Sequence, residues 1–192
     1  MNVKDKKRGR PAGKGGGLSR ESIITQAKSL MLKNGKTPSI RQLASSLNID
    51  AMAIYYYFSN KASLLEAITV SLIEDIYEPK GSADWQEELT LLCKSYLALL
   101  SDHAGLMETM LSMTTIGPAQ VFSKRFSLAL KPLALNEQDM KDAQDLLVDY
   151  LHGYALAMHC CSEPGQLTIE QLDGPLKFYM GALTSKMTVL AA

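Results

Sequence analysis

The side chains that could do chemistry by type and spacing are mostly cationic or aromatic, and they gather in the first third of the sequence. Residues 1–61 hold twelve Lys and Arg against three Asp and Glu, a net charge of +9. Residues 62–192 hold eight against seventeen, a net charge of −9, so the 192-residue chain is neutral only as a sum. Because ammonium and guanidinium groups bind phosphate oxygens, the basic third favours a polyphosphate partner such as DNA, and the acidic remainder should face away from it.

Arg8 and Arg10 lie in a basic segment, residues 1–17, which has no helical or strand periodicity and which we expect to be a flexible arm. With Gly9 and Pro11 they match the core of the AT-hook, an extended segment that binds the minor groove of A/T-rich DNA. That narrow groove attracts guanidinium groups through its negative potential, and glycine avoids a clash with it. A solvated tail that attracts phosphates without sequence preference is the alternative interpretation.

Such groups need rigid elements to position them. We predict two short helices joined by a turn for residues 39–61, SIRQLASSLNIDAMAIYYYFSNK. Ser39 and Gln42 have the spacing of a capping box at the start of the first helix. Asn48 stands where the chain must reverse, and Asn tolerates left-handed backbone. Asp50 can cap the second helix. This pattern is typical of a helix-turn-helix, whose second helix enters the DNA major groove.

The residues outside the predicted core of this unit are the candidates for DNA contact. Ile54 and Phe58 would form the buried pair of the second helix, at a spacing of four. Three consecutive tyrosines point in three directions on a helix, so they cannot all be buried on one face. The candidates are Ser39, Arg41, Gln42, Ala51, Met52, Ala53, Tyr55, Tyr56 and Lys61.

The segment Ile54-Tyr55-Tyr56-Tyr57-Phe58-Ser59-Asn60-Lys61, followed by Leu64-Leu65, closely resembles the L-Y-x-H-F-x-N-K-x-x-L-L signature of tetracycline-repressor-type (TetR-type) transcriptional regulators. The resemblance covers roughly residues 18 to 70. It implies that Arg41 contacts a base, where two hydrogen bonds to guanine would suit it best. It also implies phosphate contacts from Tyr55 and Lys61. Tyr57 replaces the histidine of the signature, so that phosphate contact is not carried over.

We expect an all-α fold of about nine or ten helices, because Gly and Pro cluster at boundaries and no alternating strand pattern appears. A flexible basic arm (1–17) would precede a three-helix helix-turn-helix DNA-binding domain (18–66) and a larger C-terminal helical domain for ligand binding and dimerisation (67–192). Gly117-Pro118 and Gly174-Pro175 are expected to separate helices. The predicted helices run from about Arg20 to Asn34, Lys61 to Tyr77, Ala83 to Ser101, Leu106 to Met113, Val121 to Leu130, Asn136 to Cys161, and onward to about Leu190.

The C-terminal domain offers candidates for two further sites. Methionine and aromatic side chains suit a pocket for an apolar or aromatic effector, although ordinary core packing is the alternative for each of them. The pocket candidates are Tyr96, Met107, Met110, Met113, Phe122 and Tyr150. The resemblance implies a dimer in which the last two long helices form a four-helix bundle with their copies. The interface candidates are Leu147, Leu151, Tyr154, Met158, Tyr179, Met180 and Leu183.

Other classes of function find little support in the sequence. No apolar run approaches the ~20 residues that cross a bilayer, and no apolar segment follows the basic N-terminus, as it would in a secretory signal. Three cysteines favour reduced thiols in a cytoplasmic protein. We expect no cofactor and no metal, and His152 and His159 beside Cys160 and Cys161 favour packing over zinc binding. No catalytic motif supports an enzyme.

The favoured hypothesis is a homodimeric, sequence-specific DNA-binding regulator, usually a repressor in the resembled family, which a small apolar or aromatic effector releases from a palindromic operator. A DNA-architectural or accessory protein that uses the basic arm without an effector is an alternative. A helical enzyme with a DNA-binding head is another. A cavity of several hundred Å³ in the acidic portion would favour the regulator over the architectural protein.

Overall fold

The computed structural model describes residues 17–103, 105–113, 116–161 and 167–190, and every regular element in these ranges is a helix. The expected all-α fold is confirmed, with nine α-helices in the described part of the chain. In chain order the elements are α1 (Arg20–Asn34), α2 (Ile40–Ser46), α3 (Ala51–Tyr55), α4 (Lys61–Glu74), α5 (Trp85–Asp102), α6 (Leu106–Leu111), α7 (Gly117–Ala129), the 3-10 helix η1 (Lys131–Leu133), α8 (Glu137–Cys160), the 3-10 helix η2 (Ile169–Leu172) and α9 (Asp173–Leu190).

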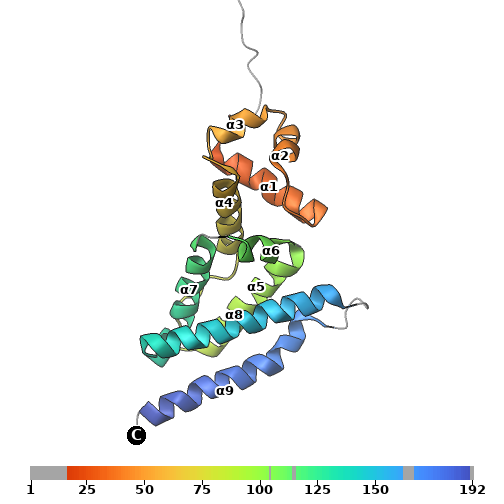
Figure 1. Ribbon diagram of the computed structural model, residues 1–192. Coiled ribbons are helices and arrows are strands. Elements are labelled where there is room, and N and C mark those ends of the chain that lie inside the picture. The colour runs from red at the N-terminus through yellow and green to blue at the C-terminus, as the bar shows by residue number, and fades with distance from the viewer. Residues whose placement is uncertain (1–16, 104, 114–115, 162–166, 191–192) are drawn as a thin grey trace, which may run out of the picture.

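The molecule is elongated, with a small head at one end and a larger body at the other (Figure 1). The head consists of α1, α2 and α3, and the body consists of α5 to α9. Helix α4 runs from the head into the body and packs against α1 on one side and α7 on the other. Helices α8 and α9 lie at the end of the body farthest from α3.

Side-chain caps explain where the helices of the head begin and end. Ser19 accepts a hydrogen bond from the Ser22 amide at 3.1 Å and starts α1, which Gly35 ends in left-handed backbone with φ of 63°. Asn60 accepts from the Ser63 amide at 2.8 Å and starts α4. The bounds expected for α1 are therefore confirmed.

The helix-turn-helix forms as its sequence predicts. Ser39 caps α2 in a reciprocal pair with Gln42, Asn48 turns the chain with φ of 54°, and the Asp50 carboxylate accepts from the Met52 amide at 2.7 Å. Helix α3 is short and ends at Tyr55, so Phe58 lies beyond it, yet Ile54 and Phe58 are both buried.

Some expected boundaries are wrong. Gly117-Pro118 and Gly174-Pro175 do not separate helices, because each pair lies in the first turn of one, α7 and α9 respectively. Proline fits there, since the amide that it lacks has no partner within the first turn. Helix α4 ends at Glu74 and not near Tyr77.

The core of the body lies where α5 packs against α7 and α8. Helix α5 has an apolar stripe that is buried along its whole length: Trp85, Leu89, Leu92, Tyr96 and Leu99. Within the described residues, no helix has both the length and the apolar character needed to cross a bilayer.

Candidate nucleic-acid interface

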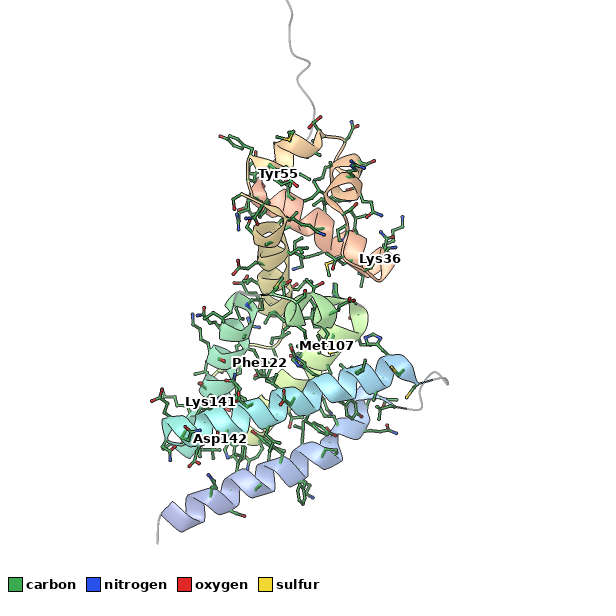
Figure 2. All side chains as sticks on the ribbon, in the orientation of Figure 1. Lys36, Tyr55, Met107, Phe122, Lys141 and Asp142 are labelled. Carbon is green, nitrogen blue, oxygen red and sulfur yellow. The ribbon has the colours of Figure 1, made fainter. Side chains whose placement is uncertain are left out.

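The outer face of α3 and the residue after it carry exposed aromatic and apolar side chains. Tyr56 is 86% exposed, Met52 is 72% exposed and Tyr55 is 40% exposed. Ala51 and Ala53 are partly buried beside them. This face lies at the free end of the molecule, where Figure 2 labels Tyr55. Exposed aromatic and apolar side chains of this kind are suited to contact with bases or sugar methylene groups.

The polar candidates are also exposed on the head. Ser39, Arg41 and Gln42 are exposed on the first turn of α2, and Lys61 is exposed at the start of α4. The Ser39 amide donates to Oε1 of Gln42 at 2.9 Å, and the Gln42 amide donates to Oγ of Ser39 at 3.3 Å. These two side chains therefore cap α2, while Arg41 of α2 and Lys61 of α4 are exposed cationic groups.

Two residues for which the sequence predicted no structural role, Arg20 and Tyr57, fix the segment that follows α3. The Arg20 guanidinium stands 4.4 Å above the Phe58 ring and donates to the Tyr57 carbonyl at 3.2 Å. The Tyr57 hydroxyl donates to the Leu18 carbonyl at 2.6 Å. Tyr57 thus fixes the chain at the point where residues 1–17 join the head, which gives a structural role to the residue that replaces the histidine of the signature.

Aromatic side chains meet in the core of the body, where Figure 2 labels Phe122. The hydroxyl of Tyr96 and Nε2 of His152 are 2.7 Å apart, and the Tyr96 and Phe122 ring centroids are 4.9 Å apart. Phe126 stacks on Phe122 at 6.3 Å. Burial raises the pKa of Tyr96 and lowers the pKa of His152, so the hydrogen bond joins two neutral groups. A polar pair therefore lies within an otherwise aromatic cluster.

Of the remaining pocket candidates, some pack against the core of the body and others lie nearer the surface. Met107 and Met110 are partly buried and pack against the core, whereas Met113 lies beyond the end of α6. Tyr150 is 40% exposed, and its ring packs 5.9 Å from that of Tyr154. The structure therefore places Tyr150 with the interface candidates and apart from Tyr96 and Phe122.

An apolar groove of about 420 Å³ lies between α8 and α9. Its walls include Leu147 and Tyr179 from the candidate list, and also Tyr150. Leu146 and Phe178 line it as well, although the sequence analysis missed both, and they are 65% and 84% exposed. Of the other interface candidates, Leu151, Tyr154 and Leu183 are buried within the chain, and Met158 and Met180 are partly buried.

Two expectations concern charged or metal-binding groups elsewhere. Arg8 and Arg10 lie outside the described residues. In the part of the chain that the structure describes, no group of three or more His, Cys, Asp or Glu side chains is placed to hold a metal ion. His152 contacts Tyr96, and Nε2 of His159 is 3.2 Å from the Leu100 carbonyl oxygen.

Comparisons with known proteins cover most of the chain. Residues 23–68 match the family model described as "Bacterial regulatory proteins, tetR family", and residues 78–176 match the model described as "Tetracyclin repressor-like, C-terminal domain". A comparison with curated proteins found no match.

Solved structures with the same fold include free, ligand-bound and DNA-bound proteins. Apo ActR from Streptomyces coelicolor has a TM-score of 0.74 at 18% identity, over 91% of this chain and 98% of that one. ActR from Streptomyces coelicolor in complex with actinorhodin has a TM-score of 0.73 at 17% identity, over 90% and 98%. BioQ with its double-stranded DNA operator has a TM-score of 0.69 at 18% identity, over 88% and 99%.

Proposed function

Because this chain belongs to the tetR family of bacterial regulatory proteins, and is thus a DNA-binding transcriptional regulator, we propose that it represses transcription from a palindromic operator until a small molecule releases it. The observation that carries this proposal is the exposed face of α3, with Met52, Tyr55 and Tyr56, in a head that also exposes the cations Arg41 and Lys61. We assign residues 18–66 to DNA binding and residues 67–192 to effector binding and dimerisation. A regulator of bacterial transcription acts where the DNA is, so the proposal places it in the cytoplasm.

In this proposal α3 lies in the major groove. Arg41 donates two hydrogen bonds to guanine, and the apolar tip formed by Ala51, Met52 and Ala53 contacts thymine methyl groups. Tyr55 and Lys61 bind phosphates on either side and hold the helix in register. Residues 1–17 add phosphate contacts or enter the neighbouring minor groove through Arg8 and Arg10.

The groove between α8 and α9 supports dimerisation. Its walls expose Phe178 and Leu146, and a second copy of the same face would cover them. A two-fold axis there would present two α3 helices to successive major grooves, with half-sites about one helical turn (~34 Å) apart.

The aromatic cluster around Tyr96 supports an effector site in the body. In this proposal a planar apolar molecule enters the buried cluster and packs on Phe122 and Phe126, and the Tyr96–His152 pair forms a hydrogen bond with a polar group on it. ActR, which has the same fold, has been seen with actinorhodin bound. The 420 Å³ groove lies on the face assigned to the dimer, so it does not serve as the expected effector cavity.

A selection of bound sequences from random duplex DNA tests the proposal with the full-length chain. We expect an enriched inverted repeat whose half-site centres lie about 10 base pairs, or one turn, apart. A DNA-architectural protein would instead enrich A/T-rich sequences without a repeat. Absence of any enriched inverted repeat would refute the proposal, and a repeat bound by a single protomer would refute its dimeric form.

A further inference from the structure

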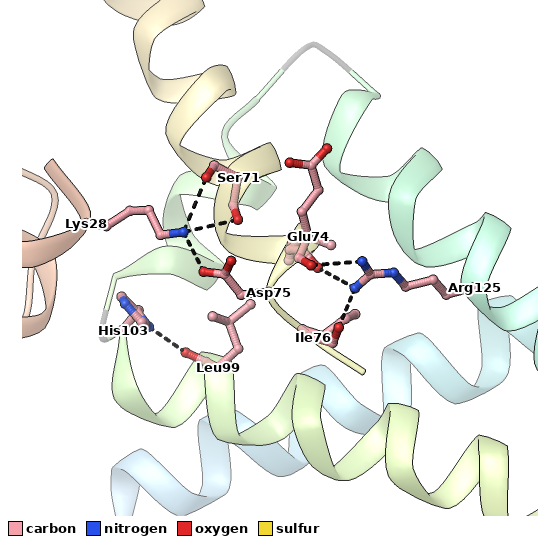
Figure 3. Close-up of polar contacts among 9 residues, drawn as sticks. Lys28, Ser71, Glu74, Asp75, Ile76, Leu99, His103 and Arg125 are labelled. Atoms are coloured by element: carbon pink, nitrogen blue, oxygen red, sulfur yellow. Dashed lines mark hydrogen bonds and ion pairs between the residues drawn. The ribbon is translucent and has the colours of Figure 1, made fainter. Parts of the chain in front are cut away.

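The C-terminal turn of α4 is held from both sides (Figure 3). Helix α4 begins directly after Asn60, next to α3, and ends among the helices of the body. A helix that joins the two parts in this way carries any movement of its far end to the head. Its last carbonyl groups have no partner within the helix, so groups from other elements must satisfy them.

Arg125 of α7 satisfies these carbonyls from the body side. Its Nη1 donates to the carbonyls of Ile73 at 3.0 Å and Ile76 at 2.6 Å, and its Nη2 donates to the carbonyl of Glu74 at 2.8 Å. A cation at a helix C-terminus is also favoured by the helix dipole. The planar guanidinium has several donors in fixed directions, so these three bonds set the position of α7 relative to α4.

Lys28 of α1 holds the same turn from the head side. Its Nζ donates to the Ser71 carbonyl at 3.3 Å and to the Ser71 hydroxyl at 3.2 Å, and it forms an ion pair with Asp75. The apolar faces of α1 and α4 also pack together in the core of the head. The head and α4 are therefore joined along the whole of α4, and a displacement of the last turn of α4 reaches α1 directly.

A second contact joins α7 to the middle of α4. A Cβ atom on Gly117 would lie 3.2 Å from Cγ2 of Val70 and 3.0 Å from Oε1 of Glu66, so the first turn of α7 touches α4 closely. Helix α7 thus meets α4 through Gly117 near its start and through Arg125 near its end. Helix α7 also carries Phe122, three residues before Arg125, and the Phe122 ring packs on the Tyr96 ring.

From these contacts we propose that α7 is the element that transmits effector binding to the head, and that Arg125 is the positioning residue that couples it to α4. This inference rests on the proposed function. A molecule that displaces the Phe122 ring moves α7, and the three bonds from Arg125 move the end of α4 with it. Because Lys28 and the buried α1–α4 contact join α4 to the head, the angle of α3 changes in turn.

The transmission step can be measured without the effector. The Phe122→Leu substitution disturbs the ring contact with Tyr96, and hydrogen exchange of the backbone amides at residues 72–76 reports on the end of α4. We expect Phe122→Leu to raise their exchange rate about fivefold or more in the wild-type background, and much less when Arg125→Met is already present. Lys124→Met, at the residue just before Arg125 on α7, also removes one positive charge and serves as the matched control.

The consequence for DNA is measured on inverted repeats with the central spacing shortened or lengthened by one or two base pairs. Wild-type protein should favour one spacing, because Arg125 fixes the tilt of α4. We expect Arg125→Met to flatten this preference by roughly fivefold or more, Arg125→Lys to flatten it less, and Lys124→Met to leave it unchanged. Circular dichroism confirms that each variant is folded.

The outcomes separate this inference from the function on which it rests. If wild-type protein favours one spacing and Arg125→Met keeps the same preference, the inference is refuted while the regulator stands. Equal exchange responses to Phe122→Leu with and without Arg125 also refute it. If wild-type protein binds no inverted repeat, the proposed function fails, and the exchange experiment still decides whether α7 and α4 are coupled.

Discussion

Replacing Phe178 by Ala should separate the proposed dimer. Phe178 is 84% exposed on α9, and burial against a second copy would contribute roughly 1.5–3 kcal/mol for each ring. The two-fold axis doubles the loss, since both protomers carry the substitution. The sum, roughly 3–6 kcal/mol, corresponds to a dimer dissociation constant about 10² to 10⁴ times higher.

Sedimentation equilibrium over a range of protein concentrations measures this change. Leu111→Ala is the matched control, because Leu111 is 70% exposed but lies on α6, away from the groove. We expect it to leave the dissociation constant unchanged. Equal association of Phe178→Ala and wild-type protein would refute the assignment of this face, and an equal loss in both variants would show that the effect is not specific to the groove.

Four other expectations can be checked separately. Arg41→Ala should relax base preference at one operator position at a cost of roughly 1–3 kcal/mol, and an unchanged preference in a repeat selection would remove Arg41 from the recognition surface. Deletion of residues 1–17 should reduce the slope of log affinity against log salt concentration, whereas an unaltered slope would exclude phosphate contacts by the arm. Tyr57→Phe should lower the free energy of unfolding by about 0.5–1.5 kcal/mol in urea titrations, while Tyr56→Phe should not, and similar losses in both would contradict the role of the Tyr57 hydroxyl. Because burial lowers the pKa of His152, the unfolded chain binds a proton at this residue more tightly than the folded chain does, and the free energy of unfolding should fall as the pH drops below the ordinary pKa of 6.5. His152→Gln should lessen that fall. An identical pH dependence in wild-type and variant protein would contradict this role of His152.

The features that depend on neighbours in the sequence were predictable. The Ser39–Gln42 box, the left-handed Asn48 and the Asp50 cap each act within three residues, so the residue types alone indicate the local backbone. The burial of Ile54 and Phe58 followed from their spacing in the same way.

The features that depend on distant partners were not predictable. Arg20 contacts a carbonyl 37 positions away, and Arg125 contacts carbonyls up to 52 positions away, and no local pattern marks either residue. The prediction that the Gly-Pro pairs separate helices was wrong for a different reason, because a dipeptide that can end one helix also fits the first turn of the next. The exposure of Phe178 on α9 could be known only from the folded structure, since periodicity marks an apolar stripe without indicating which elements cover it.

The hydrogen bond between Tyr57 and Leu18 limits how far the arm can reach. An extended chain spans at most about 3.6 Å per residue, so Arg10, eight positions before Leu18, stays within roughly 29 Å of that anchor. This radius is shorter than one turn of the double helix, ~34 Å. Each arm would therefore contact the DNA of its own half-site or the operator centre, roughly half a turn away, and would not reach the middle of the other half-site.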